Sequence, residues 1–266
     1  MQIGDKKSLK ITGTAKKEQN ILLDEINYSL TKFIYETLAS NSPEFSRELH
    51  EVGFKKGKKS FKGVCFSRPY FSDFTLKENG IISVGKFVTI EVRSLVEGFL
   101  DNFILGLYKS GKIKIGEAEF SFEEVKILPE PRFKTEEMFY LDTPLVLSVK
   151  DHSTGKAKYL RYLDDREKFK EALKRNLKEK YSAFYGNEID LTDFDFSFDE
   201  SYMATAAKHS KLITYCDQRI YGELAPFTIK APIEVMEMIY YSGIGEKNMM
   251  GFGFISKKLK IKGGRV

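Results

Sequence analysis

The hydrophobic positions in the first half of the chain follow the periods of strands and helices in turn. Residues 9–14 predict a short first strand. Apolar side chains recur at three- and four-residue spacing over residues 23–37 and again over residues 92–107, which predicts two amphipathic helices. The alternating positions at residues 61–67 predict a further strand, and residues 120–128 predict the strand that closes the unit.

A shorter helix is predicted between these elements from the residues that start and stop helices. Ser42 can cap it, Pro43 suits its first turn, and Gly53 follows shortly after its end. Further along, the Glu78-Asn79-Gly80 segment predicts the turn of a hairpin. The main elements therefore run strand, helix, strand, strand, helix, strand, which is the ferredoxin-like pattern.

The second half of the chain starts with a similar order of elements. Residues 145–149 and 157–162 predict a hairpin, and Asp164 or Asp165 can cap a helix over residues 169–181. Strand-like runs, a short helix and a final strand follow at residues 194–198, 212–215, 227–230, 232–241 and 252–261.

The predicted fold class is α+β, with two tandem ferredoxin-like (RRM-like) domains. The chain of 266 residues is long enough for two ordinary domains, and 42% hydrophobic residues are enough for a packed core. Pro129 and Pro131 interrupt both helix and sheet, so we place the domain boundary there. The predicted domains are residues 1–130 and residues 131–266.

Positive charge is concentrated in two segments. Residues 47–68 hold seven Lys or Arg against two acids, and residues 256–266 hold five with no acid, whereas the whole chain carries only +5. Segments this basic suit a polyanionic partner. Such runs are also common on solvated surfaces, so charge alone leaves both interpretations open.

The cysteines and the N-terminus exclude several classes of protein. Cys65 and Cys216 form no CxxC pair and no Cys/His cluster, so we expect buried free thiols, no metal site and no cofactor. The first residues lack the apolar core of a signal peptide, and no run of about 18 apolar residues occurs. We therefore expect a cytoplasmic protein with no membrane partner.

A glycine-rich segment precedes the predicted final strand. Gly243, Gly245, Gly251 and Gly253 surround Lys247, and the segment follows a predicted helix. Glycine permits positive φ, and outward N–H groups with a nearby lysine can hold phosphate oxygens. The alternative is a tight connection that merely needs glycines. The spacing fits neither a Rossmann nor a Walker pattern.

This glycine segment resembles the C-terminal glycine-rich loop of the RAMP superfamily, in particular of the Cas-six endoribonucleases that process CRISPR repeat RNA. The shared pattern is Gly-x-Gly, five residues that include a basic one, and Gly-x-Gly. The resemblance extends along most of the chain through short segments. These are Phe33-Ile-Tyr35-Glu-Thr-Leu, Leu49-His50-Glu-Val, Phe66-Ser67, Thr143-Pro144-Leu145 and Tyr181-x-x-Phe184-Tyr185-Gly186.

His50 is the histidine best placed for catalysis. It lies near the end of the short predicted helix, where the helix dipole favours the imidazolium, and it adjoins the basic segment. A histidine with a pKa near neutrality suits general acid or base catalysis, and lysines can stabilise a phosphorane. We expect His152 and His209 to be solvated surface residues.

The resemblance implies roles for specific residues. A Tyr on the first helix, the His and a following Lys form the family's active site, and these correspond to Tyr35, His50 and Lys62, with Lys58 or Lys59 as alternatives to Lys62. RNA-binding residues are expected in the basic segment and in the glycine-rich loop. They are Lys55, Lys56, Lys58, Lys59, Gly243, Gly245, Lys247, Gly251 and Gly253.

The resemblance implies an endoribonuclease that cleaves CRISPR repeat RNA without a metal ion, by attack of a 2′-OH on the neighbouring phosphorus. The products would carry 2′,3′-cyclic phosphate and 5′-OH ends. Three alternatives stay open: a protein that binds repeat RNA without cleaving it, a structural subunit of a CRISPR effector complex, and an unrelated α+β enzyme. The expected partner is precursor CRISPR RNA, and effector-complex proteins or a second copy of the chain are further candidates.

Overall fold

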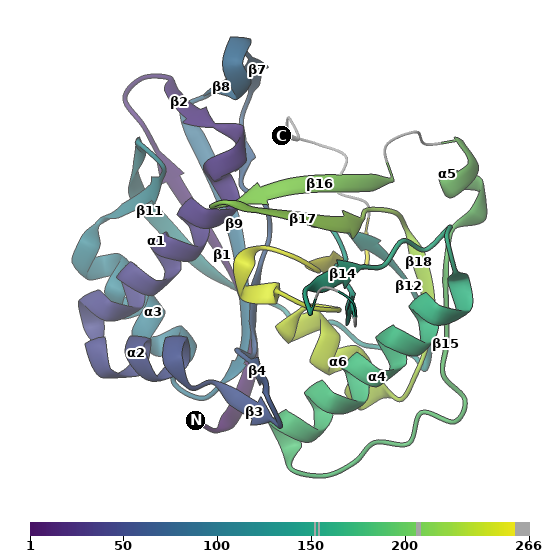
Figure 1. Cartoon of the computed structure of the whole chain (residues 1–266). Coiled ribbons are helices and arrows are strands. Elements are labelled where there is room, and N and C mark those ends of the chain that lie inside the picture. The colour runs from purple at the N-terminus through teal and green to yellow at the C-terminus, as the bar shows by residue number, and fades with distance from the viewer. Residues whose placement is uncertain (152, 154, 206–208, 259–266) are drawn as a thin grey trace.

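The computed structural model describes residues 1–151, 153, 155–205 and 209–258. Two units of helices and strands lie side by side (Figure 1). The first is built on an antiparallel sheet with the order β11-β1-β9-β5. Its main strands are β1 (Ile3–Thr14), β5 (Val64–Phe66), β9 (Phe87–Val96) and β11 (Ala118–Leu128). Helices α1 (Ile26–Asn41), α2 (Pro43–Glu51) and α3 (Phe99–Ser110) complete this unit.

The second unit repeats this arrangement. Its sheet has the order β15-β18-β12-β19. The strands are β12 (Glu136–Leu141), β15 (Asp195–Phe198), β18 (Phe227–Lys230) and β19 (Ile255–Ser256), and the helices are α4 (Arg166–Tyr185), α5 (Glu200–Thr205) and α6 (Ile233–Ser242). Counted along the chain, both sheets place the first strand between the third and the fourth, with the second beside the third. This is the ferredoxin-like βαββαβ fold, so the predicted fold class is confirmed.

Short strands and hairpins extend both units. In the first unit they are β2 (Gln19–Leu22), β3 (Phe54–Lys56), β4 (Lys59–Phe61), β6 (Tyr70–Phe71), β7 (Phe74–Leu76), β8 (Ile81–Val84) and β10 (Lys112–Ile115). In the second they are β13 (Ser148–Lys150), β14 (Ala157–Tyr159), β16 (Ser210–Tyr215) and β17 (Gln218–Glu223). Three hairpins, β3–β4, β13–β14 and β16–β17, lie near the junction of the two units (Figure 1).

Local sequence signals account for the short helix α2. The Ser42 side chain accepts a hydrogen bond from Phe45 N at 3.3 Å, and Pro43 begins the helix. His50 occupies the last turn, where it meets the negative end of the helix dipole. The predicted turn at residues 78–80 also forms, between β7 and β8.

The predicted helix over residues 92–107 is wrong in its first third. Residues 92–96 end the central strand β9, and the helix begins only at Phe99. Both faces of the strand are covered at this end, because every residue from 92 to 96 is buried. Its apolar residues, Val92, Leu95 and Val96, therefore do not alternate, and their spacing of three and four mimics the face of a helix. Gly98, with φ +73°, separates the two elements because this conformation suits neither a strand nor a helix.

Two further expectations are wrong. Cys65 is buried, but Cys216 is exposed in the β16–β17 turn, where its φ is +50°. His209 is partly buried and not a freely solvated surface residue: its side chain is 17% exposed and its Nδ1 lies 3.0 Å from Glu223 Oε2. His152 and most of the basic C-terminal segment, residues 259–266, lie outside the described residues. Of the described helices, none is both long and apolar enough to span a membrane.

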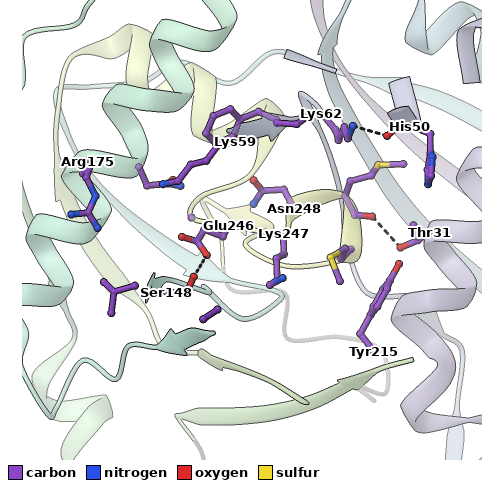
Figure 2. Close-up of a pocket in the computed structure, with 18 of the residues that line it drawn as sticks. Thr31, His50, Lys59, Lys62, Ser148, Arg175, Tyr215, Glu246, Lys247 and Asn248 are labelled. Atoms are coloured by element: carbon purple, nitrogen blue, oxygen red, sulfur yellow. Dashed lines mark hydrogen bonds between the residues drawn. The ribbon is translucent and has the colours of Figure 1, made fainter. Parts of the chain in front are cut away.

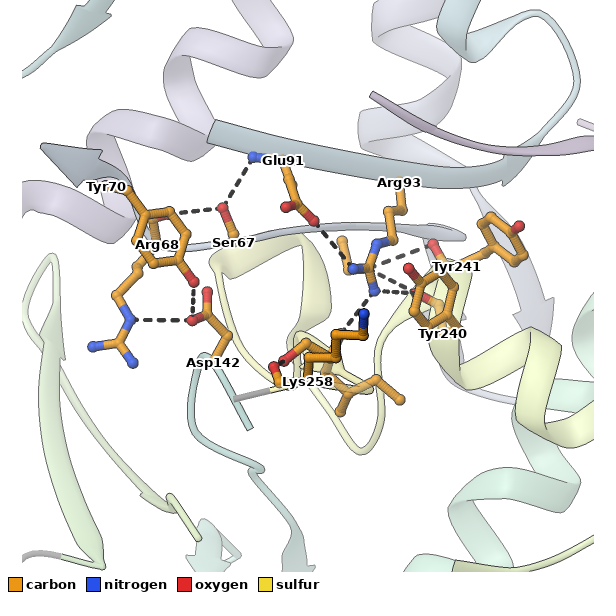
Figure 3. Close-up of polar contacts among 12 residues, drawn as sticks. Ser67, Arg68, Tyr70, Glu91, Arg93, Asp142, Tyr240, Tyr241 and Lys258 are labelled. Carbon is orange, nitrogen blue, oxygen red and sulfur yellow. Dashed lines mark hydrogen bonds and ion pairs between the residues drawn. The ribbon is translucent and has the colours of Figure 1, made fainter. Parts of the chain in front are cut away.

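Polar side chains join the two units (Figure 3). Arg93 on β9 is buried, and its guanidinium lies 3.7 Å from the ring centre of Tyr240 and 4.0 Å from that of Phe254. It also donates to Ile255 O at 2.8 Å. Asp142 at the end of β12 accepts from the Tyr70 hydroxyl of the first unit. The units therefore meet through oriented contacts as well as a shared apolar core.

Candidate functional site

A cavity of about 1010 Å³ lies where the two units meet (Figure 2). The first unit contributes α1, the end of α2 and the strand β4 with the residue that follows it. The second contributes the β13–β14 hairpin, α4, the end of β16 and the glycine-rich loop. Elements separated by some two hundred residues in sequence thus form one cavity.

Three residues named from the sequence meet on the first-unit wall of this cavity. The rings of Tyr35 and His50 are 5.0 Å apart in an edge-to-face arrangement. Lys62 Nζ donates to the His50 carbonyl oxygen at 2.7 Å (Figure 2). Lys62 thus lies beside His50. Lys59 reaches the cavity elsewhere, and Lys58 is not among the described residues that line it.

Burial changes the proton affinities in this cluster. It raises the pKa of the Tyr35 hydroxyl well above its ordinary value, and the nearby Tyr215 adds to the increase. Burial lowers the pKa of Lys62, and the positive charge of Lys55 lowers it further. Tyr35 is therefore a protonated hydrogen-bond donor at neutral pH, and Lys62 is a stronger acid than an ordinary lysine.

The basic segment forms the β3–β4 hairpin, and α4 holds one side of it. Lys56 Nζ donates to Ser182 Oγ at 2.8 Å, and Lys59 Nζ lies 2.5 Å from Glu179 Oε2. Lys55 and Lys58 are exposed and have no ion-pair partner within the described part of the chain. The hairpin is a positioned basic element, and two of its four lysines present their charge to solvent.

The glycines of the loop are required by close packing. A Cβ at Gly253 would overlap the Ile244 carbonyl oxygen, and a Cβ at Gly243 would lie 2.6 Å from Asn248 Nδ2. Both glycines have positive φ, as do Gly245 and Gly251. All four are buried.

The expectation that the loop amides point outward is wrong at two glycines. Gly251 N donates to Asn248 O at 3.1 Å, and Gly253 N donates to Pro144 O at 2.9 Å. These N–H groups are used inside the protein and cannot hold phosphate while the bonds persist. Gly243 does not line the cavity, whereas Gly245 and Lys247 do. The loop therefore presents its central residues to the cavity and uses its glycines to pack.

Two domain models match this chain. The model described as "CRISPR-associated protein Cas6, N-terminal" matches residues 23–126, and the model described as "CRISPR associated protein Cas6, C-terminal" matches residues 128–257. Together they cover most of the sequence. The chain belongs to the Cas6 family.

Curated Cas6 relatives resemble the chain over nearly their full length. The CRISPR-associated endoribonuclease Cas6 1 of Methanocaldococcus jannaschii is 29% identical over 244 residues, 88% of this chain and 90% of the relative. The CRISPR-associated endoribonuclease Cas6 of Pyrococcus furiosus is 24% identical over 247 residues, 90% of this chain and 83% of the relative.

Solved structures share the fold. A Cas6-related protein from Pyrococcus furiosus superposes with a TM-score of 0.80 at 20% identity, covering 96% of this chain and 100% of that one. A RAMP protein described as binding different RNA substrates superposes with a TM-score of 0.77 at 21% identity, covering 94% of this chain and 98% of that one.

Sequence analysis of this Cas6 chain missed a buried lysine beneath the loop. Lys180 Nζ donates to Gly243 O at 2.7 Å, to Gly245 O at 3.0 Å and to Asn248 Oδ1 at 2.7 Å. Burial lowers the pKa of Lys180 to about 7. Its spacing from Leu173 and Leu177 places it on the buried face of α4, which is a signal that the sequence did contain.

Asn248 is the second missed residue of the loop. Its Nδ2 donates to Ile244 O and to Phe252 O, each at 3.0 Å, while its Oδ1 accepts from Lys180. One side chain thus connects both ends of the loop to α4. An asparagine within a glycine-rich segment is common in loops, so the sequence pattern alone did not distinguish it.

Proposed function

We propose that this Cas6 family protein binds precursor CRISPR RNA and cleaves it within the repeat. The observation that supports this most directly is the cavity that combines Tyr35, His50 and Lys62 with Lys247 of the glycine-rich loop. Its size suits a nucleotide, and its cations suit the phosphates on either side. The endoribonuclease names of its relatives agree with an RNA substrate.

In the proposed reaction, a ribose 2′-oxygen attacks the adjacent phosphorus. His50 takes the 2′-OH proton, because an exposed imidazole at a helix end can be reached by the RNA and can hold the proton. The bond from phosphorus to the 5′ oxygen breaks, and that oxygen takes up a proton. The products are a 2′,3′-cyclic phosphate and a 5′-OH.

Lys62 and Tyr35 support this reaction in different ways. The Lys62 ammonium is held beside His50 and stabilises the extra negative charge of the phosphorane. Its lowered pKa also suits it to protonate the leaving 5′ oxygen. Tyr35, whose pKa is raised, stays protonated and donates a hydrogen bond to the phosphate.

Cleavage should persist without divalent metal ions. We expect purified protein in EDTA to cut labelled repeat RNA at one position, because the proposed acid, base and cation are all side chains. Mass spectrometry of the upstream fragment should show a cyclic phosphate. RNA with a 2′-deoxy nucleotide at that position should bind but stay intact. Activity that is lost in EDTA and restored by Mg²⁺ would contradict this mechanism, and tight binding without any cutting would favour the binding-protein alternative.

The exposed lysine at the tip of the β3–β4 hairpin should contribute one phosphate contact. Replacing Lys58 with glutamine should weaken RNA binding and reduce the slope of log affinity against log salt concentration by about 0.7, as for one contact to single-stranded RNA. Filter binding at several salt concentrations measures the slope. The matched control is Lys86→Gln, an exposed lysine in the β8–β9 turn that does not line the cavity. An unchanged slope for the Lys58 variant would show that Lys58 does not contact an RNA phosphate.

A further inference from the structure

The charged side chains that line the cavity are mostly basic, and one of them is a carboxylate. The basic side chains that line it are those of His50, Lys59, Lys62, Lys150, Arg175 and Lys247. Among the described residues that line the cavity, Glu246 is the one acid. A carboxylate repels phosphate, so Glu246 weakens any site that only holds an RNA backbone. In this position a carboxylate is suited to bind a part of the RNA that offers hydrogen-bond donors, and not a phosphate.

The Glu246 carboxylate is held in place. Ser148 on β13 donates its hydroxyl to Glu246 Oε2 at 2.7 Å (Figure 2). The Glu246 backbone N–H donates to Val146 O at 2.9 Å, which attaches the residue to the same segment. Within the described residues no Lys or Arg nitrogen forms an ion pair with this carboxylate, so its remaining lone pairs can accept bonds from a ligand.

A second polar group on the same wall lacks partners. Asn176 on α4 is 2% exposed and lines the cavity, and neither Nδ2 nor Oδ1 has a hydrogen-bond partner among the described residues. It lies one helical turn before Lys180, which holds the Gly245 carbonyl oxygen, so Asn176 faces the start of the same loop. A buried amide without partners costs free energy that a polar ligand can recover after a small rotation of the amide.

We infer that Glu246, Ser148 and Asn176 form a subsite that reads the Watson–Crick edge of a guanine in the RNA. This inference rests on the proposed RNA binding. Guanine presents N1–H and N2–H as adjacent donors, which match the two oxygens of a carboxylate, and its O6 accepts from the Asn176 amide. Tyr215, Phe61 and Met249 line the same cavity and offer apolar faces for the base.

The other bases fit this carboxylate less well. Adenine and cytosine each place an acceptor nitrogen beside their amino group, and that nitrogen would face a carboxylate oxygen with no proton between them. Uracil offers one N–H flanked by two carbonyl oxygens, which the carboxylate repels. A bidentate side-chain pair discriminates between bases by about 1–3 kcal/mol, roughly fivefold to more than a hundredfold in affinity.

The experiment measures binding of repeat RNAs in which each guanine in turn is replaced by inosine, which lacks only the 2-amino group. A 2′-deoxy nucleotide at the cleavage position keeps these RNAs intact. At one guanine, inosine should weaken binding to the unaltered protein by about fivefold or more. In Glu246→Ala, which has no side-chain acceptor for the 2-amino group, this difference should disappear. Ser148→Ala should reduce this difference. Asn176→Leu should weaken binding of the guanine RNA and of the inosine RNA equally, because inosine retains O6.

The control is Glu171→Ala, which removes an exposed carboxylate of α4 outside the cavity and should leave the guanine preference intact. Thermal unfolding of each variant confirms that it is folded. Normal cleavage with no inosine effect at any position, or an effect that survives in Glu246→Ala, would overturn the subsite and leave the proposed function standing. A guanine preference without cleavage would support the subsite and contradict the proposed endonuclease activity. Absence of RNA binding would overturn both.

Discussion

Replacing His50 with alanine is expected to slow RNA cleavage by a factor of about 100 to 10,000, the range typical of a lost general acid or base. His50 is exposed and its ring contacts Tyr35 edge-on, so the substitution removes the proton acceptor without opening the core. RNA affinity and thermal stability should change little. Single-turnover cleavage with excess protein measures the rate of the chemical step without a contribution from product release.

Two comparisons separate catalysis by His50 from a structural effect. Added imidazole should restore part of the activity of His50→Ala, because a free base can enter the space left by the side chain. Glu51→Ala, at the exposed neighbouring position of α2, should cleave at the unaltered rate. Cleavage by His50→Ala at the rate of the unaltered protein would exclude His50 from the mechanism.

The Lys180→Met substitution should destabilise the protein by about 3 kcal/mol at neutral pH. It leaves three buried acceptors without a donor, the carbonyl oxygens of Gly243 and Gly245 and the Asn248 Oδ1, and each costs about 1–3 kcal/mol. Release of a buried charge offsets part of this cost. RNA affinity should also fall, because the loop that carries Lys247 loses its support. Denaturant unfolding and filter binding measure the two effects.

The stability difference between the unaltered protein and Lys180→Met should depend on pH. In the folded chain the pKa of Lys180 is about 7, below its ordinary value of 10.5. Between these two values the unfolded chain binds the proton that the folded chain has released, so raising the pH favours folding. The unaltered protein should therefore gain up to about 1.4 kcal/mol per pH unit relative to the variant. Unfolding at pH 7 and pH 9 tests the sign, and a constant difference would contradict the lowered pKa.

The neighbouring exposed lysine provides the control for both measurements. Lys178 lies two residues before Lys180 on α4 and points to solvent, so Lys178→Met should leave stability and its pH dependence unchanged. Destabilisation of both variants by the same amount would show that any methionine on this helix is harmful. A specific effect of Lys180 would identify it as a positioning residue for the loop.

Elements with strong local signals were predicted well from the sequence. The cap at Ser42 and Pro43 sets the start of α2, and the Asp165 side chain accepts from Lys168 N at the start of α4. Both signals act within a single helical turn, so they do not depend on the rest of the fold. The error at residues 92–96 arose where a strand is covered on both faces, because there the apolar pattern no longer distinguishes strand from helix.

The choice of lysine shows where local reasoning ends. Counting along the basic segment left Lys58, Lys59 and Lys62 as candidates for the place beside His50. The β3–β4 hairpin separates them: it turns Lys58 to solvent, pairs Lys59 with Glu179 and brings Lys62 to the His50 carbonyl oxygen. Hairpin register and packing against α4 decided this. The register is local to the hairpin, but the packing joins Lys56 to Ser182 and Lys59 to Glu179, each more than a hundred positions away.

The sequence by itself determined the order of elements in the two ferredoxin-like units and the segments that carry the family resemblance, because periodicity, helix caps and glycine spacing are local properties of the chain. Only the tertiary structure showed that the glycines pack inside the protein, that Lys180 and Asn248 hold the loop, and that Glu246 and Asn176 lie in the cavity with His50. These relations join residues from distant parts of the chain. Hydrogen bonding and close packing between the two units create them, and no local pattern carries that information.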